Sequence, residues 1–184
     1  MISLKLFKLL HILYILMRQY LLNKKIMWHK IIAVLMGLLL SLFSVNPAIA
    51  AMDYAKQVLL ESDFSNKDLR GVTFNLANLL KADLSGSDLQ GASLFGAKLQ
   101  EADMSNTNLT DATLDSAILE GTDLTNAILE DAFAFNTKFK DVKISGADFT
   151  NVPFRADVLD DLCLVAEGTN PITGRLTKET LGCK

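Results

Sequence analysis

A large apolar residue recurs at every fifth position from Phe64 to Phe154, through nineteen consecutive places of which only Ala134 is small. Two positions before most of these residues stands a small or slim side chain. A helix would carry a period of five around its surface, and a strand would place successive members on opposite faces. All of these side chains can point inward only if the chain turns once per repeat. The sequence therefore predicts a solenoid with an apolar core.

The outward positions show how many repeats close one coil. At a spacing of twenty, the residues that precede the central ones form an acidic column, made of Asp63, Asp83, Asp103 and Asp123 and followed by Lys143. At a spacing of fifteen the same positions show no order. We therefore expect four repeats in each coil and nearly five coils in the run.

The segment from Ala77 to Leu114, "ANLLKADLSGSDLQGASLFGAKLQEADMSNTNLTDATL", resembles the pentapeptide-repeat family, whose motif is loosely A(D/N)LXX. The resemblance implies an all-β solenoid over residues 64–156. In this family the chain folds as a right-handed quadrilateral β-helix, here of about five coils of four pentapeptides, with the central and the small residues inside. It implies little about function.

Both ends of a solenoid expose apolar core and unpaired strand edges, so we expect a short helical cap at each. Residues 51–63 carry apolar side chains behind a candidate N-cap at Asp53, which predicts a short helix. Residues 157–184 are expected to form a second helical cap, because they begin with one apolar helical stripe. That stripe consists of Val158, Leu159, Leu162 and Val165. A disulfide loop is expected within the same segment.

Residues 1–50 are interpreted as a leader. Within it, residues 27–50 have the form of a signal peptide, with a basic start, an apolar run and a small-residue cleavage site that ends at Ala50. The apolar run is too short for a comfortable membrane span, so no stable membrane insertion is expected after cleavage. Residues 1–26 either lie upstream of a true start at Met27 or form a bipartite targeting leader or membrane anchor.

Cleavage after Ala50 would remove both histidines, His11 and His29. Their loss excludes Ser-His-Asp and Cys-His catalysis and any His-ligated zinc site, so we expect no enzyme, no cofactor and no metal centre. The remaining chain has 12 basic and 21 acidic residues, a net charge of about −9. This charge repels the nucleic-acid backbone, so nucleic acid is not expected as a partner.

Cys163 and Cys183 are the two cysteines of the chain. In an exported protein they suggest a disulfide that closes a loop of about 20 residues, worth roughly 3 kcal/mol. A pair of free thiols and an intermolecular bridge are the alternatives. The tail "LCLVAEGTNPITGRLTKETLGC" resembles the C-terminal segment of pentapeptide-repeat proteins of the thylakoid lumen of cyanobacteria and chloroplasts, in which a cysteine pair flanks a G-x-N-P-x-T-G turn. This resemblance implies the thylakoid lumen, with the periplasm as the alternative.

Two surfaces are candidate sites. The ladder of Asp63, Asp83, Asp103 and Asp123 could hold a divalent cation, or its carboxylates could accept turn hydrogen bonds. Phe95, Phe133 and Phe135 fall in outward positions and could mark a partner surface. Alternatively, a bulge at Ala134 would turn Phe133 or Phe135 inward to fill the core.

The function that these features favour is a non-catalytic, exported scaffold or interaction protein, monomeric, with an unknown protein partner. One alternative is a DNA-mimic pentapeptide protein that binds topoisomerase, a class that net acidity supports. The other is a weak divalent-metal-binding protein of the lumen.

Overall fold

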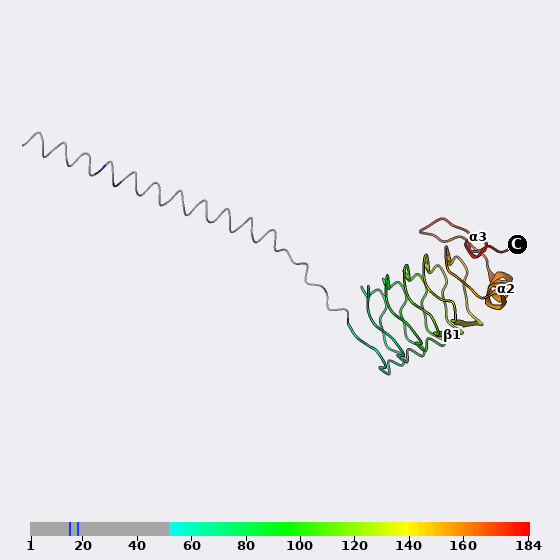
Figure 1. Cartoon of the computed structure of the whole chain (residues 1–184), viewed down its shortest axis with the longest axis horizontal. Coiled ribbons are helices and arrows are strands. Elements are labelled where there is room, and N and C mark those ends of the chain that lie inside the picture. The colour runs from blue at the N-terminus through cyan, green and yellow to red at the C-terminus, as the bar shows by residue number, and fades with distance from the viewer. Residues whose placement is uncertain (1–14, 16–17, 19–51) are drawn as a thin grey trace, which may run out of the picture. The chain divides into compact units, whose positions relative to one another are not determined.

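The computed structural model describes residues 52–184 together with Ile15 and Arg18 (Figure 1). Residues 52–184 belong to one compact unit. The expected leader and cleavage site lie outside the described residues, apart from Ile15 and Arg18. Within the described part of the chain, no helix has the length and apolarity needed to cross a membrane.

The chain winds as a β-helix in which residues twenty apart are neighbours, as the outward columns predicted. Parallel bridges join Asp63 to Asp83, Asp83 to Asp103 and Asp103 to Asp123, and three further columns repeat this pattern. A coil of twenty residues contains four pentapeptides, so the coil is four-sided. Figure 1 shows the coils stacked along one axis from cyan to yellow. One side becomes regular strand where β1 (Ile118–Glu120) pairs in parallel with β2 (Lys138–Lys140).

Backbone hydrogen bonds explain why one pentapeptide makes one turn. The N–H of Leu109 donates forward to the carbonyl of Ile128 in the next coil at 2.6 Å, while the N–H of Ala112 donates to the carbonyl of Leu109 at 3.0 Å. Two residues after most central residues the backbone enters the left-handed region, with φ of +58° at Asp111 and +64° at Gly86. Gly, Asn and Asp tolerate this conformation best, which accounts for their frequency at this corner.

The central and the small residues of the inner repeats are both buried, as expected. Leu109 and Ala112 are fully inaccessible, and the same holds for most repeats between Phe74 and Leu129. Ala134 is also buried, and the N–H of Leu114 still donates to the carbonyl of Phe133 at 2.8 Å. The corner that follows departs from the repeat, because the N–H of Asn136 donates to Oδ1 of Asp115 at 3.1 Å. The core is therefore one continuous apolar column.

The expected N-terminal helix over residues 51–63 is wrong for residues 52–63, which are described. These residues instead continue the repeat, with bridges from Asp53 to Thr73 and from Val58 to Asn78. Tyr54 occupies a central position, where its ring stacks on Phe74 with centroids 5.1 Å apart. The β-helix thus starts before Phe64.

The C-terminal segment contains α2 (Ala156–Val165) and the short helix α3 (Thr177–Leu181). Leu162 of α2 and Leu181 of α3 are buried and belong to the same apolar core as the coils. A disulfide between Cys163 and Cys183, with Cα atoms 5.6 Å apart, connects α2 to the residues just after α3.

Candidate interaction surfaces

The four predicted aspartates do form one column on the surface, but their oxygens are engaged in turns. In each, Oδ1 accepts the backbone N–H two residues later at 2.9 Å, and the donors are Ser65, Ser85, Ser105 and Thr125. The hydroxyl of Ser65 donates to the same oxygen of Asp63, and these bonds lower the pKa of Asp63. Lys143 closes the column, with its Nζ 3.0 Å from Oδ2 of Asp123.

The geometry supports the structural interpretation of this ladder. Each carboxylate stabilises the corner that follows it, which is the ordinary role of Asp before a turn. Among residues 52–184 and the two described leader residues, no group of three or more His, Cys, Asp or Glu side chains is arranged to hold a metal ion.

The three predicted phenylalanines point outward. Phe95, Phe133 and Phe135 are 44%, 49% and 44% exposed, so neither ring beside Ala134 turns inward. Leu76, at 51% exposed, lies on the same side of the coil, and a Cβ atom on Gly96 would meet its side chain at 2.7 Å. We call these four residues the aromatic face.

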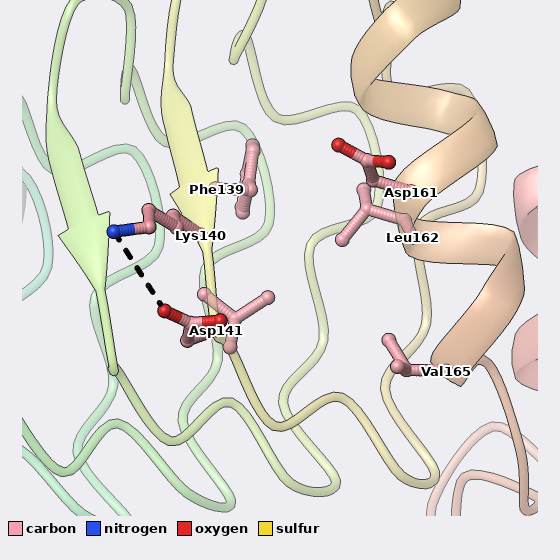
Figure 2. Close-up of a pocket in the computed structure, with 7 residues that line it drawn as sticks. Phe139, Lys140, Asp141, Asp161, Leu162 and Val165 are labelled. Atoms are coloured by element: carbon pink, nitrogen blue, oxygen red, sulfur yellow. Dashed lines mark ion pairs between the residues drawn. The ribbon is translucent and has the colours of Figure 1, made fainter.

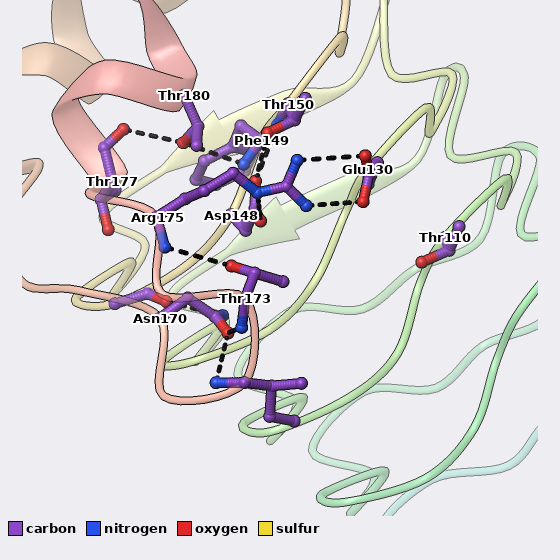
Figure 3. Close-up of polar contacts among 12 residues, drawn as sticks. Thr110, Glu130, Asp148, Phe149, Thr150, Asn170, Thr173, Arg175, Thr177 and Thr180 are labelled. Atoms are coloured by element: carbon purple, nitrogen blue, oxygen red, sulfur yellow. Dashed lines mark hydrogen bonds and ion pairs between the residues drawn. The ribbon is translucent and has the colours of Figure 1, made fainter.

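The loop between α2 and α3 is attached to the coils by Asn170, which is almost completely buried. Its side-chain nitrogen donates to the carbonyl of Gly146 at 2.9 Å, and its Oδ1 accepts the N–H groups of Ile172 and Thr173, both at 3.0 Å. One side chain thus shapes the loop and fixes it to the last coil (Figure 3).

Arg175 makes the second attachment, which is electrostatic. Its Nη1 and Nη2 donate to the two carboxylate oxygens of Glu130 at 3.1 and 2.6 Å, and its Nε lies 2.7 Å from Oδ2 of the fully buried Asp148 (Figure 3). The hydrogen bonds from Arg175 lower the pKa of Glu130. Burial opposes ionisation of Asp148, but hydrogen bonds from Thr150 and Thr173 and the charge of Arg175 together lower its pKa.

A groove lies between β2 and α2. Its volume is about 320 Å³, and it is bounded by residues 139–142 on the coil and by Asp161, Leu162 and Val165 on the helix (Figure 2). Lys140 is held at its edge, with Nζ 2.8 Å from Oε1 of Glu120 and 3.9 Å from Oδ2 of Asp141.

Comparison with known proteins agrees with this architecture. The sequence model of the family described as Pentapeptide repeats matches residues 61–91 and 92–131, with eight copies. The crystal structure of a pentapeptide repeat protein from the thylakoid lumen of Arabidopsis thaliana is 39% identical, with a TM-score of 0.53, over 74% of this chain and 88% of that one. The chain belongs to the pentapeptide-repeat family.

A curated relative of this pentapeptide-repeat protein is described as thylakoid lumenal 15 kDa protein 1, chloroplastic, from Arabidopsis thaliana. It is 54% identical over 48 residues, and the match spans 26% of this chain and 21% of the relative. A plasmid-mediated fluoroquinolone resistance protein is 21% identical over 57% of this chain and 70% of its own, with a TM-score of 0.28. At this identity and TM-score the similarity says nothing about function.

Sequence reasoning missed the groove and the attachments of the C-terminal loop. Asn170 and Arg175 lie outside the repeats, so no period pointed to them. The available signal was the G-x-N-P-x-T-G turn, because Asn before a turn commonly bonds to backbone N–H groups, as Asn170 does.

Proposed function

We propose that this pentapeptide-repeat protein is a non-catalytic interaction protein of the thylakoid lumen that presents a rigid side face to a protein partner. The observation that carries the proposal is the aromatic face, in which three half-exposed phenylalanines stand on coils joined by parallel bridges. Phe95 and Phe135 occupy the same position two coils apart, roughly 10 Å at the usual strand spacing. Exposed aromatic clusters of this kind mark protein interfaces.

The coil fixes this face before a partner arrives. Asn75 accepts hydrogen bonds from the hydroxyl of Ser93 at 2.6 Å and from the N–H of Phe95 at 3.1 Å, which ties neighbouring coils together beneath the ring. A surface held in this way loses little conformational entropy on binding, which favours affinity.

The chemistry of the mature chain also favours binding over turnover. Residues 51–184 contain no histidine, and both cysteines are paired in the structure. The compartment is proposed from the lumenal origin that both Arabidopsis matches carry in their descriptions and from the signal-like residues 27–50, with the periplasm as the alternative. The right-handed winding that the resemblance implies, the count of about five coils and the C-terminal helical cap belong to the same proposal.

The test has two parts. Fractionation of the native membranes, with N-terminal sequencing of the recovered protein, should find it in the lumen with Ala51 first. Recovery from the cytosol would contradict the compartment and would favour the DNA-mimic alternative.

The second part measures partner capture by the full chain and by two variants. A Phe95→Ser/Phe135→Ser variant should lose at least tenfold of the captured partner. Val58→Ser is the matched control, because Val58 is an exposed apolar residue on another side of the coil, and it should capture normally. Equal capture by both variants would show that the aromatic face is not the binding surface.

A further inference from the structure

The last coil leaves hydrogen-bond donors without acceptors at the edge of β2. In the earlier coils on this side, the N–H of Leu99 donates to the carbonyl of Ile118 at 2.9 Å and the N–H of Gly121 to that of Lys140 at 2.8 Å. Phe139 and Asp141 occupy the equivalent positions in the last coil. Neither N–H has an acceptor in the described structure where the next coil would lie.

The helix that stands in that place cannot supply the missing acceptors. The inner carbonyls of α2 accept hydrogen bonds from its own backbone, so it presents side chains to β2 instead of backbone acceptors. It also stands far enough away to leave the groove of about 320 Å³, near the lower end of the range of about 300–1,000 Å³ for binding sites. Natural proteins generally cover such edges, and here the cover is incomplete (Figure 2).

The donors define the kind of ligand that fits. Two N–H groups separated by one residue on a strand edge pair with alternate carbonyls of an extended peptide. Phe139, Val142, Leu162 and Val165 provide an apolar lining for its alternate side chains.

Charge defines the ligand further. Asp141 and Asp161 line the groove, and α2 contains no Lys or Arg. Lys140, the basic residue of the lining, is already paired with Glu120. We infer that the groove between β2 and α2 binds an extended segment of a partner protein in which Lys or Arg alternates with apolar residues.

This inference adds a second binding surface to the aromatic face, and the two can fail separately. The Phe95→Ser/Phe135→Ser variant leaves β2 and α2 unchanged. Loss of binding in the groove would therefore leave the proposed function intact, and the reverse also holds.

The experiment uses two five-residue probes with acetylated and amidated ends, one of alternating valine and lysine and one with glutamate in place of lysine. Amide resonances and exchange rates of the full chain are measured by NMR during titration with each probe. The lysine probe should slow exchange at Phe139 and Asp141 at least tenfold and should bind at least tenfold more tightly than the glutamate probe.

Two charge-reversal variants provide the control. Asp161→Lys, inside the groove, should invert the preference between the probes, whereas Asp160→Lys, one residue outside the lining, should leave it unchanged. Equal responses of the two variants, or no protection of either amide at millimolar probe, would overturn the inference. Protection of both amides in the chain alone would also overturn it, and a dependence on protein concentration would identify a second copy as the occupant.

Discussion

Arg175 and Glu130, 45 residues apart in the sequence, form a bidentate ion pair, with Nη2 of the arginine 2.6 Å from Oε2 of the glutamate. The same guanidinium approaches Asp148, which is bridged to Ile128 in the neighbouring coil. One side chain of the C-terminal loop therefore connects the last two coils. The loop behaves as part of the fold for this reason, although it contains no repeat.

Replacement of Arg175 should weaken the attachment of this loop. Arg175→Met leaves the buried Asp148 carboxylate without its cation, so we expect the melting temperature to fall by roughly 3–6 °C. Arg155→Met is the matched control, because Arg155 pairs with Asp157 on the exposed surface at 2.9 Å, and such pairs contribute little. Circular dichroism melts of both variants measure the difference, and similar shifts would contradict the role of Arg175.

The same contacts predict a dependence on pH. The pKa values of Glu130 and Asp148 are both lowered in the folded chain, so ionisation of these groups stabilises the docked loop above their ordinary values. This contribution is lost as the pH falls from about 4.5 through the lowered folded values. Melts from pH 7 to pH 3 should therefore show a smaller loss of stability in Arg175→Met than in the natural chain. Parallel curves would contradict this linkage.

Asn170 should contribute at least as much as Arg175 to the stability of the docked loop, through hydrogen bonds alone. Asn170→Ala leaves the buried carbonyl of Gly146 and the N–H groups of Ile172 and Thr173 without their partner, so we expect a loss of about 2–3 kcal/mol. Asn136→Ala is the control, because Asn136 bonds to Asp115 on the exposed surface and should cost less than about 1 kcal/mol. Urea denaturation of the two variants gives both values. Similar losses would show that the loop is not anchored through Asn170.

The repeats could be predicted from sequence because every inner coil needs a large and a small apolar residue at the same two positions. At Leu109 and Ala112 the large and the small residue meet neighbours above and below, so the five-residue pattern is visible. No described residue covers the outer side of the first coil, and Met52, Gln57 and Lys67 stand exposed in places that are small elsewhere. The pattern is therefore degraded there, and the residues were interpreted as a helix.

The candidate surfaces were predictable to different degrees. The outward position of Phe95 and the aspartate column follow from the repeat register alone. The groove does not follow from the register, because its width is the separation between α2 and β2. That separation depends on the tertiary packing of α2 through the buried Leu162.

Reduction of the disulfide should loosen the C-terminal cap and leave the coils folded. Cys163 and Cys183 close a loop that lies outside the repeats, and the closure is worth roughly 3 kcal/mol. With reductant, trypsin should therefore cut faster at Lys178, and the freed edge near Phe149 should promote end-to-end association. A Cys163→Ala/Cys183→Ala variant should be cut at the fast rate with or without reductant. Identical digestion of the natural chain in both conditions would show that the disulfide does not hold the cap.

The five-residue register itself can be tested by placing the same charge inside and outside a coil. Leu109 is fully buried, so Leu109→Asp places an unpaired carboxylate in the middle of the apolar column and should cost more than about 4 kcal/mol. Gln90 is exposed, and Gln90→Asp should change the free energy of unfolding by less than about 0.5 kcal/mol. Urea denaturation followed by circular dichroism measures both. The contrast depends only on which residue faces the core, so equal effects of the two substitutions would refute the register on which the whole fold rests.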